Sequence, residues 1–274
     1  MKKYLSIIIP HINLKDILDE CINSIYKYTE KIAFEIIVID NNSIDGSLDM
    51  LREKYPHVRI IENSKNLGFN RAVNQGIKLS QSKYILIYNN DAILIEDSFS
   101  KMIEIIDDDI QVGAIGCKLI YPDGTLQYSS YSFPTIFTEL WETFFLDKLF
   151  NKSKLFGKYR MSWWDHSTQK NVDWLAGTVL LTKKEIIERV GYFNQSSLGG
   201  AADMEFCYRL KDAGLKRIYT PHTKIIHYLS LTTSKYRGKD NILFRANYLY
   251  DSILFYLRVF QKYNGNLTFI LLIF

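Results

Sequence analysis

The sequence predicts an α/β protein whose core is a mostly parallel sheet flanked by helices. Over the first 121 residues, short apolar runs alternate with segments in which apolar residues recur at the spacing of an amphipathic helix. Within the apolar runs there is no alternation of apolar with polar residues. Strands of that kind are buried on both faces, as they are in parallel sheets that helices cover on two sides.

Five strands joined by helices are expected in this part of the chain. The first strand begins at Leu5 and is closed by Pro10, which has no N–H to donate to a sheet. The first helix carries one apolar stripe that runs from Leu14 to Tyr26. The expected strands cover residues 5–9, 35–40, 58–63, 84–88 and 112–121, and the other helices cover residues 48–55, 72–77 and 99–106.

Beyond residue 121 the pattern weakens and then returns. Residues 123–133 are typical of a hairpin or extended segment, and residues 134–171 are aromatic, basic and poorly periodic, as in a variable insertion over a site. The elements expected after it are a strand and a helix in 172–193, a helix ending at Gly214, strands at 215–221 and 224–230, and a long helix at 239–263.

The composition limits the class of protein. The chain has 274 residues, 47% of them hydrophobic, which suits one large domain or one domain with an appendage. A formal net charge of +4 is too small to indicate a nucleic-acid partner. Cys21, Cys117 and Cys207 lack metal-ligand spacing and indicate reduced core thiols in a cytoplasmic protein. No run approaches the roughly 18 apolar residues of a spanning helix.

Two segments allow more than one interpretation. Residues 148–160 place five cations among Leu, Phe and Tyr, so they form a solvated face or meet phosphates or an anionic membrane surface. The apolar side chains of the 239–263 helix extend beyond one stripe. This helix therefore packs on the domain, pairs with a second subunit as a homodimer, or lies on a membrane with Arg245, Arg258 and Lys262 at the phosphates.

Polar residues follow the first four expected strands, where each strand ends. They are "PHIN" (10–13), "DNNSIDGS" (40–47), "ENSKNLGFNRAVN" (62–74) and "NNDA" (89–92). Ligands of open α/β sheets bind outside the carboxyl ends of the strands, so these residues predict a site along one rim.

The motifs on this rim exclude several chemistries. No G-x-G-x-x-G follows the first strand, and the chain has neither a P-loop nor a G-x-S-x-G elbow. Carboxylates remain at the strand ends, and His227 ends an apolar run further along. Oxygen ligands with one imidazole suit Mg²⁺ or Mn²⁺, and a single carboxylate such as Asp91 is sufficient for Mg²⁺ if substrate phosphates supply the other ligands.

Seven stretches, taken in order, resemble family 2 glycosyltransferases with the GT-A fold, closest to the bacterial rhamnosyltransferase-like branch. The resemblance covers about residues 4–235 and implies a Rossmann-like domain with a nucleotide-binding half (1–121) and an acceptor half (122–235), followed by a helical extension (236–274). The stretches are "SIIIPHIN", "EIIVIDNNSIDGS", "ENSKNLGFNRAVNQGI", "YILIYNNDA", "WLAGTVLLTKKEIIERVGYF", "ADMEFCYRLKDAG" and "IIHYLSLTT".

The resemblance implies a metal site for the donor diphosphate. Asn89, Asn90 and Asp91 occupy the place of the family's DxD motif, and Asp91 would hold Mg²⁺ or Mn²⁺. Asn89 replaces the first acid and would contact ribose or phosphate, with Asn90 beside it in the nucleotide site. His227 matches the position that can complete the metal site, although a lone histidine is more often structural.

The resemblance also implies a nucleotide pocket. Pro10, Ile12, Asp40, Asn42 and Asp45 would line it, with Asp40 near the base or ribose. For Asp45 the alternative is a helix cap beside the glycine that follows it.

A second part of the donor site is expected at the start of a helix. Asn66, Gly68 and Arg71 offer backbone N–H groups and a cation suited to anions. Gly68 either forms only a tight turn or allows the turn to approach the nucleotide.

The acceptor side of the resemblance centres on Asp203, which would be the general base. Glu205 takes the place of the last acid of the family's E-D-x-D motif, and Ala202 replaces the first. Trp174 and Gly177 would line the sugar sites. The alternatives are that Asp203 is a helix N-cap, that Glu205 is a first-turn acid favoured by the helix dipole, and that Trp174 is ordinary core.

The implied activity is inverting, metal-dependent transfer of a sugar from a UDP- or dTDP-linked donor to a hydroxyl of a glycan or lipid-linked glycan. The expected setting is bacterial surface polysaccharide synthesis in the cytoplasm, with peripheral contact at the inner face of the plasma membrane as an option. Two alternatives stay open. One is a non-catalytic sugar-nucleotide-binding member of a glycan assembly complex, and the other is a sugar nucleotidyltransferase, which would normally carry a Gly-rich loop after its first strand.

Overall fold

In the computed structural model, residues 4–196, 200–228 and 242–265 are described. The first half alternates strands and helices as predicted. Its elements are β1 (Leu5–His11), α1 (Lys15–Tyr28), β2 (Phe34–Asp40), α2 (Ser47–Lys54), β3 (Arg59–Glu62), α3 (Phe69–Leu79), β4 (Tyr84–Tyr88), β5 (Ala92–Leu94), α4 (Ser98–Asp108) and β6 (Val112–Ile120). The short strand β5 is the one element of this half that the sequence pattern did not indicate.

The second half completes the sheet and adds helices on its surface. Its elements are β7 (Leu126–Gln127), β8 (Ser130–Tyr131), α5 (Ile136–Thr143), α6 (Leu146–Leu149), β9 (Lys170–Asn171), β10 (Trp174–Leu175), β11 (Val179–Lys183), α7 (Lys184–Val190), α8 (Ala202–Asp212), β12 (Lys216–His227) and α10 (Ile242–Asn264). The predicted boundary at residue 235 lies outside the described residues.

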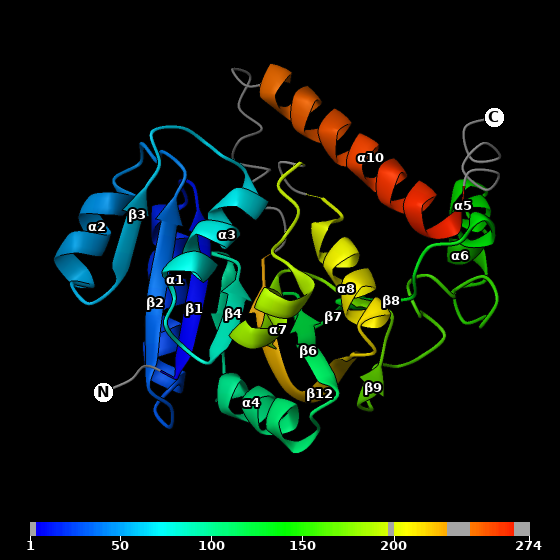
Figure 1. Cartoon of the computed structure of the whole chain (residues 1–274), viewed down its shortest axis with the longest axis horizontal. Coiled ribbons are helices and arrows are strands. Elements are labelled where there is room, and N and C mark those ends of the chain that lie inside the picture. Colours follow the sequence, from blue (N-terminus) through cyan, green and yellow to red (C-terminus); the bar gives the residue numbers. More distant parts are fainter. Residues whose placement is uncertain (1–3, 197–199, 229–241, 266–274) are drawn as a thin grey trace.

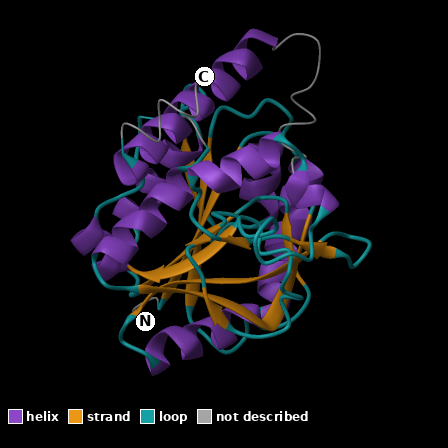
Figure 2. Ribbon diagram, turned by 90° about the vertical axis from the view of Figure 1, so that its right-hand side faces the viewer, coloured by secondary structure: helices purple, strands orange, loops and turns teal. Residues whose placement is uncertain are grey.

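The strands form one sheet in the order β3-β2-β1-β4-β11-β6-β12-β5, with β7 and β9 attached beside this path. Strands β3, β2, β1 and β4 run parallel, and β6 and β12 are parallel to each other. Strand β11 lies antiparallel between β4 and β6. Helices cover both faces of this sheet (Figures 1 and 2). The predicted mostly parallel α/β architecture is confirmed.

Strand β12 corrects one prediction. Two strands were expected at 215–221 and 224–230, but the chain forms a single strand over Lys216–His227. The register with β6 shifts between Thr220 and Lys224, on either side of Pro221. A bulge at this point tolerates proline, so the strand continues where the sequence suggested an end.

Two hydrophobic clusters occupy the two faces of the sheet. One packs α1, α2 and α4 against it, with Leu18, Leu51 and Met102 among its buried members. The other packs α3, α7, α8 and α10, and includes Val73 and Phe206. Helices α1, α2, α3 and α4 therefore bury most of the apolar residues that their sequence periodicity indicated.

The long helix α10 packs on the domain, one of the three options left open for it. Its Phe255 and Phe260 are buried, the Tyr263 ring stacks on Tyr208 of α8, and the Tyr256 hydroxyl donates to Glu139 of α5 at 2.5 Å. Figure 1 shows α10 running past α8 toward α5 and α6. The Arg245 side chain lies outside the described residues, and its phosphate contact stays a prediction.

The position of α3 on β1 depends on Gly76. A Cβ atom at Gly76 would lie 2.4 Å from Cγ2 of Ile8 and 3.1 Å from its Cγ1, and Ile8 belongs to a fully buried central strand. The absence of a side chain at this one point lets the helix approach the sheet closely.

We expect Gly76→Ala to destabilise the protein by about 1–3 kcal/mol, because the clash with Ile8 outweighs the roughly 1 kcal/mol gain in helix propensity. Chemical denaturation measures the change. Combining Gly76→Ala with Ile8→Ala removes the clashing atom, so the cost of the glycine substitution should fall in that background. An equal cost in both backgrounds would contradict the close approach.

Candidate active site

The carboxyl ends of the strands meet along one rim, as the sequence predicted. His11 at the end of β1 lies opposite Asp40 at the end of β2 in the parallel register. Strand β4 ends at Tyr88, and the turn Asn89–Ala92 follows it, with the Ala92 N–H donating to the Asn89 carbonyl at 3.2 Å. The sheet therefore places three of the predicted polar segments side by side.

The structure brings Asp91 and His227 into direct contact. His227 Nε2 lies 3.0 Å from Asp91 Oδ1, and both side chains are almost fully buried. Their backbones are fixed as well, because β5 pairs Ala92 with His227 and the Tyr228 N–H donates to the Asp91 carbonyl at 3.0 Å. Asp91 and His227 are 136 positions apart in the sequence, and the pairing of β5 with β12 holds them together.

A second layer of contacts orients the imidazole. Gln127 Oε1 lies 2.6 Å from His227 Nδ1, and an amide oxygen can only accept, so this contact assigns the proton to Nδ1. Nε2 is then the nitrogen that faces the Asp91 carboxylate. Asn89 Nδ2 lies 3.4 Å from the same Nε2. A metal-binding histidine usually has such a partner for its other nitrogen, and no sequence pattern indicated that Gln127 would supply it.

The Asp91–His227 pair has the chemistry and spacing of adjacent ligands to one divalent cation. Neighbouring ligands in octahedral coordination lie about 3.0 Å apart when each bond is about 2.1 Å long. Among the residues that the structure describes, no group of three or more His, Cys, Asp or Glu side chains could hold a metal. A bound phosphate group and water are suited to supply the remaining ligands of a cation here.

Asp203 lies in the first turn of α8, two residues beyond the N-cap, which is Ala201, so it does not cap that helix. Gly177 N–H donates to its Oδ2 and Met204 N–H to its Oδ1, both at 2.8 Å. Burial raises the pKa of Asp203, against the effect of these hydrogen bonds. The carboxyl group is consequently fixed in direction and more basic than an ordinary aspartate.

A short path of contacts joins Asp203 to the end of β4. Gly177, which donates to Asp203, is followed by Thr178, whose carbonyl accepts from the Asn89 N–H at 2.9 Å. The predicted base and the predicted metal-binding turn are therefore anchored to two successive residues. That all three predicted groups share one cavity remains a prediction.

Trp174 belongs to an aromatic group next to Asp203. Its ring stacks on Tyr131 with centroids 4.3 Å apart, its Nε1 donates to Ser132 O at 3.1 Å, and Tyr159 lies against both rings. Burial and the charge of Asp203 both act to raise the pKa of the Tyr131 phenol to about 12. The Trp174 side chain is half-buried and packs against the hydrophobic core, and its contact with a sugar stays a prediction.

The loop after β2 is fixed largely by its own carboxylates. Asp40 accepts the Ser43 N–H at 2.9 Å and also the Ser43 hydroxyl. Asp45 accepts the Lys15 N–H at 2.8 Å and the Ser47 N–H at 3.1 Å, so it caps the first turns of both α1 and α2. The capping alternative for Asp45 is therefore realised. Asn42 is exposed in this loop with φ 72°, and its contact with a ligand stays a prediction.

The turn before α3 is held by a hydrogen bond between two of the predicted site residues. Gly68 precedes the helix with φ 83° and ψ 166°, a conformation that side chains disfavour, and its N–H donates to Asn66 Oδ1 at 2.9 Å. Arg71 is exposed in the first turn. Contact of these residues with a nucleotide remains a prediction.

His11 is a rim residue that the sequence reasoning missed, although it stands between Pro10 and Ile12, which were predicted. Burial lowers its pKa to about 4, against the charges of Asp40 and Asp45, so the ring is neutral. Asn90 Nδ2 lies 2.9 Å from His11 Nδ1, which leaves the proton on Nε2. This buried Nε2 has no hydrogen-bond partner among the described residues. The sequence signal was a histidine at the carboxyl end of a core strand.

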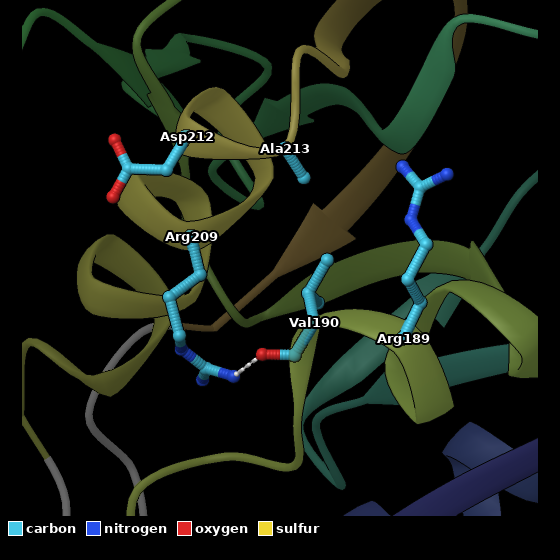
Figure 3. A pocket seen from close by; sticks show the side chains of 5 residues that line it. All are labelled: Arg189, Val190, Arg209, Asp212 and Ala213. Atoms are coloured by element: carbon cyan, nitrogen blue, oxygen red, sulfur yellow. Dashed lines mark hydrogen bonds between the residues drawn. The ribbon is translucent and has the colours of Figure 1, made fainter.

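Glu205 is committed to a structural ion pair. Its carboxylate lies 2.9 Å from Nη2 of Arg209, which also donates to the carbonyls of Val190, Gly191 and Tyr192. A pocket of about 530 Å³ beside this pair is lined by Arg189, Val190, Arg209, Asp212 and Ala213 (Figure 3). None of the predicted site residues lines it, so it is separate from the rim described above.

These features define an α/β protein with a carboxylate–imidazole pair, a fixed carboxylate and glycine turns at the carboxyl ends of parallel strands. A family model described as "Glycosyl transferase family 2" matches residues 6–177, more than half of the chain. The chain therefore belongs to glycosyl transferase family 2, as the resemblance predicted.

Relatives and solved structures agree with this assignment. The chain is 26% identical over 235 residues to the O-antigen biosynthesis protein RfbC of Myxococcus xanthus, covering 82% of this chain and 17% of that protein. It is 24% identical over 229 residues to the N-acetylglucosaminyl-diphospho-decaprenol L-rhamnosyltransferase of Mycobacterium tuberculosis, covering 80% of this chain and 74% of that protein. The chain thus spans only a small part of one relative and about three quarters of the other.

The fold is similar to that of GT-A glycosyltransferases. A mannosyltransferase from Pyrobaculum calidifontis, solved with GDP-Man and Mn²⁺, matches with a TM-score of 0.59 and 18% identity over 94% of this chain and 65% of that one. GalNAc-T7, solved with UDP, GalNAc and Mn²⁺, matches with a TM-score of 0.62 and 15% identity over 82% of this chain and 44% of that one. The predicted GT-A fold is confirmed.

None of the helices in the described parts of the chain combines the length and the hydrophobicity that a bilayer crossing requires.

Arg209→Leu should lower the free energy of unfolding by about 3 kcal/mol, because it removes the nearer cation from the buried Glu205 carboxylate and leaves it with Lys262, whose Nζ lies 4.0 Å from Oε1. Arg189→Leu removes an exposed arginine from the same pocket and should change stability by less than about 0.5 kcal/mol. Denaturant titration compares the two. Equal small effects would show that Glu205 is available for a role other than this ion pair.

Proposed function

We propose that the chain transfers a sugar from a nucleoside-diphosphate donor to an acceptor hydroxyl, with inversion at the anomeric carbon. The observation that carries this proposal is the contact between Asp91 and His227 at the end of β4, because two adjacent ligands there leave coordination positions for a diphosphate. Asp203, fixed near the same turn, supplies a base. Membership of glycosyl transferase family 2 supports the reaction class.

On this proposal the rim residues bind and orient the donor. Asp91 and His227 would hold Mg²⁺ or Mn²⁺, which when bound would stabilise the negative charge of the departing diphosphate. Asn89, Asn90 and the Gly68 turn face the phosphates or ribose. Pro10, Ile12, Asp40, Asn42 and Asp45 line the nucleotide pocket, to which Asn66 and Arg71 add an amide and a cation. His11 joins this set as a neutral donor.

The acceptor side places a base beside an aromatic surface. Asp203 accepts the proton of the acceptor hydroxyl as its oxygen attacks the anomeric carbon, and its raised pKa favours that step. The half-buried Trp174, stacked on Tyr131, offers a flat apolar face to a sugar ring, and the absence of a side chain at Gly177 keeps the approach to Asp203 open. Glu205 contributes indirectly, by bracing α8 through Arg209.

The donor class is proposed from the resemblance described above, and the acceptor class and setting are supported by the names of relatives. We propose a UDP- or dTDP-linked donor and a glycan or lipid-linked glycan acceptor in bacterial surface polysaccharide synthesis, at the cytoplasmic side of the membrane. The names of the Myxococcus and Mycobacterium relatives support this setting. A non-catalytic member that only binds sugar nucleotide is the second candidate, because Ala202 and Asn89 replace family acids.

Asp91→Asn should weaken nucleoside-diphosphate binding in the presence of Mn²⁺ by at least about tenfold, since it removes the charged ligand of the cation. Titration calorimetry with UDP and with dTDP, each with Mn²⁺ and with EDTA, measures the effect. Asp108→Asn alters an exposed aspartate on α4 and should bind as the unaltered protein does. If the affinity for UDP and dTDP changed neither with Mn²⁺ nor with Asp91→Asn, the proposed metal site would be wrong.

Asp203→Asn should abolish turnover of a UDP- or dTDP-sugar while donor binding persists, because an amide cannot accept the proton. The pH profile of kcat/KM should lose activity as pH falls through a pKa above the usual range for aspartate, because the base is inactive once protonated. Asp212→Asn on the exposed side of α8 is the matched control. Unaltered activity of Asp203→Asn would remove this residue as the base, and donor binding by an inactive unaltered protein would favour the non-catalytic candidate.

A further inference from the structure

Helix α5 has the reverse of the usual surface-helix arrangement. Phe137, Leu140 and Phe144 recur at helical spacing, and their side chains are 61%, 39% and 67% exposed. The carboxylates face the protein instead, since Glu139 accepts the Tyr256 hydroxyl and Glu142 accepts Arg160 Nε at 3.0 Å. Burial raises the pKa of both glutamates. A water-facing helix would have its apolar and acidic residues the other way round.

The exposed apolar face continues through α6 and the turn after it. We call this set the α5–α6 surface, and its largest members are each close to half exposed or more. They are Phe137, Phe144, Phe145, Leu149, Phe150 and Leu155. Apolar side chains scattered singly over a surface need no explanation, but a contiguous run of aromatic and aliphatic residues in one structural unit indicates an interaction site.

This unit is firmly built, so its exposed residues are not the result of loose packing. Thr135 and Thr138 form a capping box at the start of α5. Arg160 contacts Glu142 and also lies 3.7 Å from Asp147 Oδ2, which ties the end of the segment back to α5 and α6. The segment that the sequence showed only as poorly periodic therefore presents its apolar face on a fixed scaffold.

Exposed lysines are interspersed in the sequence with the residues of the α5–α6 surface. Lys148, Lys152, Lys154 and Lys158 are all exposed, and Lys148 Nζ lies 4.9 Å from the centre of the Phe145 ring. Aromatic and aliphatic side chains bordered by lysines are suited to a surface that is apolar inside and negatively charged outside. An anionic phospholipid bilayer has this structure, with acyl chains beneath a layer of phosphates.

We propose that the α5–α6 surface is a docking site for an anionic phospholipid bilayer, with the six apolar side chains in the acyl boundary and the four lysines at the lipid phosphates. This decides between the two options that the sequence left open for residues 148–160. On this proposal the membrane contact considered for α10 belongs to another element. Helix α10 packs on the domain through Phe255 and Phe260 and leaves Leu249, Tyr250 and Ile253 exposed.

Other occupants fit the surface less well. A second copy bound symmetrically would bring lysines against lysines, which like-charge repulsion opposes. Residues 266–274, "NLTFILLIF", carry no ionisable side chain, so they offer nothing to the four lysines.

The surface adjoins the acceptor side of the proposed active site. Arg160 follows Tyr159, which lies against Tyr131 and Trp174. If the proposed function holds, a docked membrane would deliver a lipid-linked acceptor toward Asp203. Membrane binding itself does not depend on that function, so an inactive protein that binds vesicles would leave the present inference intact.

Flotation of the full chain with vesicles tests the proposal. The protein should float with phosphatidylcholine vesicles that contain phosphatidylglycerol, and much less with pure phosphatidylcholine. Raising the salt from about 0.1 M to about 0.5 M should weaken binding, because it screens the lysines. No flotation with either vesicle, or equal flotation with both at both salt concentrations, would overturn the proposal.

Matched variants locate the contact. Lys148→Ser with Lys154→Ser should lower the partition coefficient about 25-fold, since each lysine contributes about fivefold, and Phe145→Ser with Leu149→Ser should lower it at least about tenfold. Lys27→Ser with Lys224→Ser, and Ile110→Ser, remove exposed residues elsewhere and should bind normally. Folding of each variant is checked by its thermal melt.

Two further outcomes would contradict the assignment. Loss of vesicle binding on Phe269→Ser with Leu271→Ser, with normal binding by the Phe145 and Leu149 variant, would assign the contact to residues 266–274. A dimer in light scattering that the Phe145 and Leu149 variant dissociates, without vesicle binding by the unaltered protein, would make the surface a protein interface.

Discussion

The contact between Asp91 and His227 is the constraint on which the proposed site depends. A buried carboxylate beside a buried imidazole is costly unless a cation or a proton lies between them. The fold nevertheless holds the two groups 3.0 Å apart, through the pairing of β5 with β12 and the orientation of the ring by Gln127. The surrounding structure keeps the two side chains in contact. His227 ends the buried strand β12, and Asp91 lies in the buried turn before β5.

The other residues of the rim are positioned around this pair. Parallel strands bring His11 and Asp40 to the same edge, and the Asn89 turn links that edge to Asp203 through Thr178 and Gly177. The predicted nucleotide-binding half and the predicted acceptor half thus meet at backbone contacts. Glu205 shows the opposite case, in which an acid at a family motif position stabilises the scaffold through Arg209 instead of facing the rim.

Much of the fold could be predicted because buried strands and amphipathic helices leave clear periodic patterns. The missing details depend on partners distant in sequence. Strand β5 is only three residues long and exists because β12 lies beside it, and the bulge that carries β12 past Pro221 needs β6 as a template. Local periodicity carries no information about either neighbour.

For the candidate site as well, residues with a local sequence signal could be predicted, and residues whose role depends on distant partners could not. The positions of residues at strand ends, together with the resemblance, indicated Asp91, Asp203 and His227. Gln127 was missed because its role depends on its contact with the His227 imidazole, which is 100 positions away in the sequence. The orientation of helix α5 could not be predicted from the sequence for a related reason. Glu139 and Glu142 contact Tyr256 and Arg160, which are brought to the helix only in the folded chain.

The most direct test of the central claim is pulsed electron paramagnetic resonance of Mn²⁺ bound to the protein with UDP or dTDP, using protein labelled with ¹⁵N at histidine. The account predicts a ¹⁵N coupling from a directly bound imidazole that disappears in His227→Gln, together with ³¹P couplings from the nucleotide phosphates. A Mn²⁺ signal with phosphate couplings but no histidine coupling, or one unchanged in His227→Gln, would contradict it.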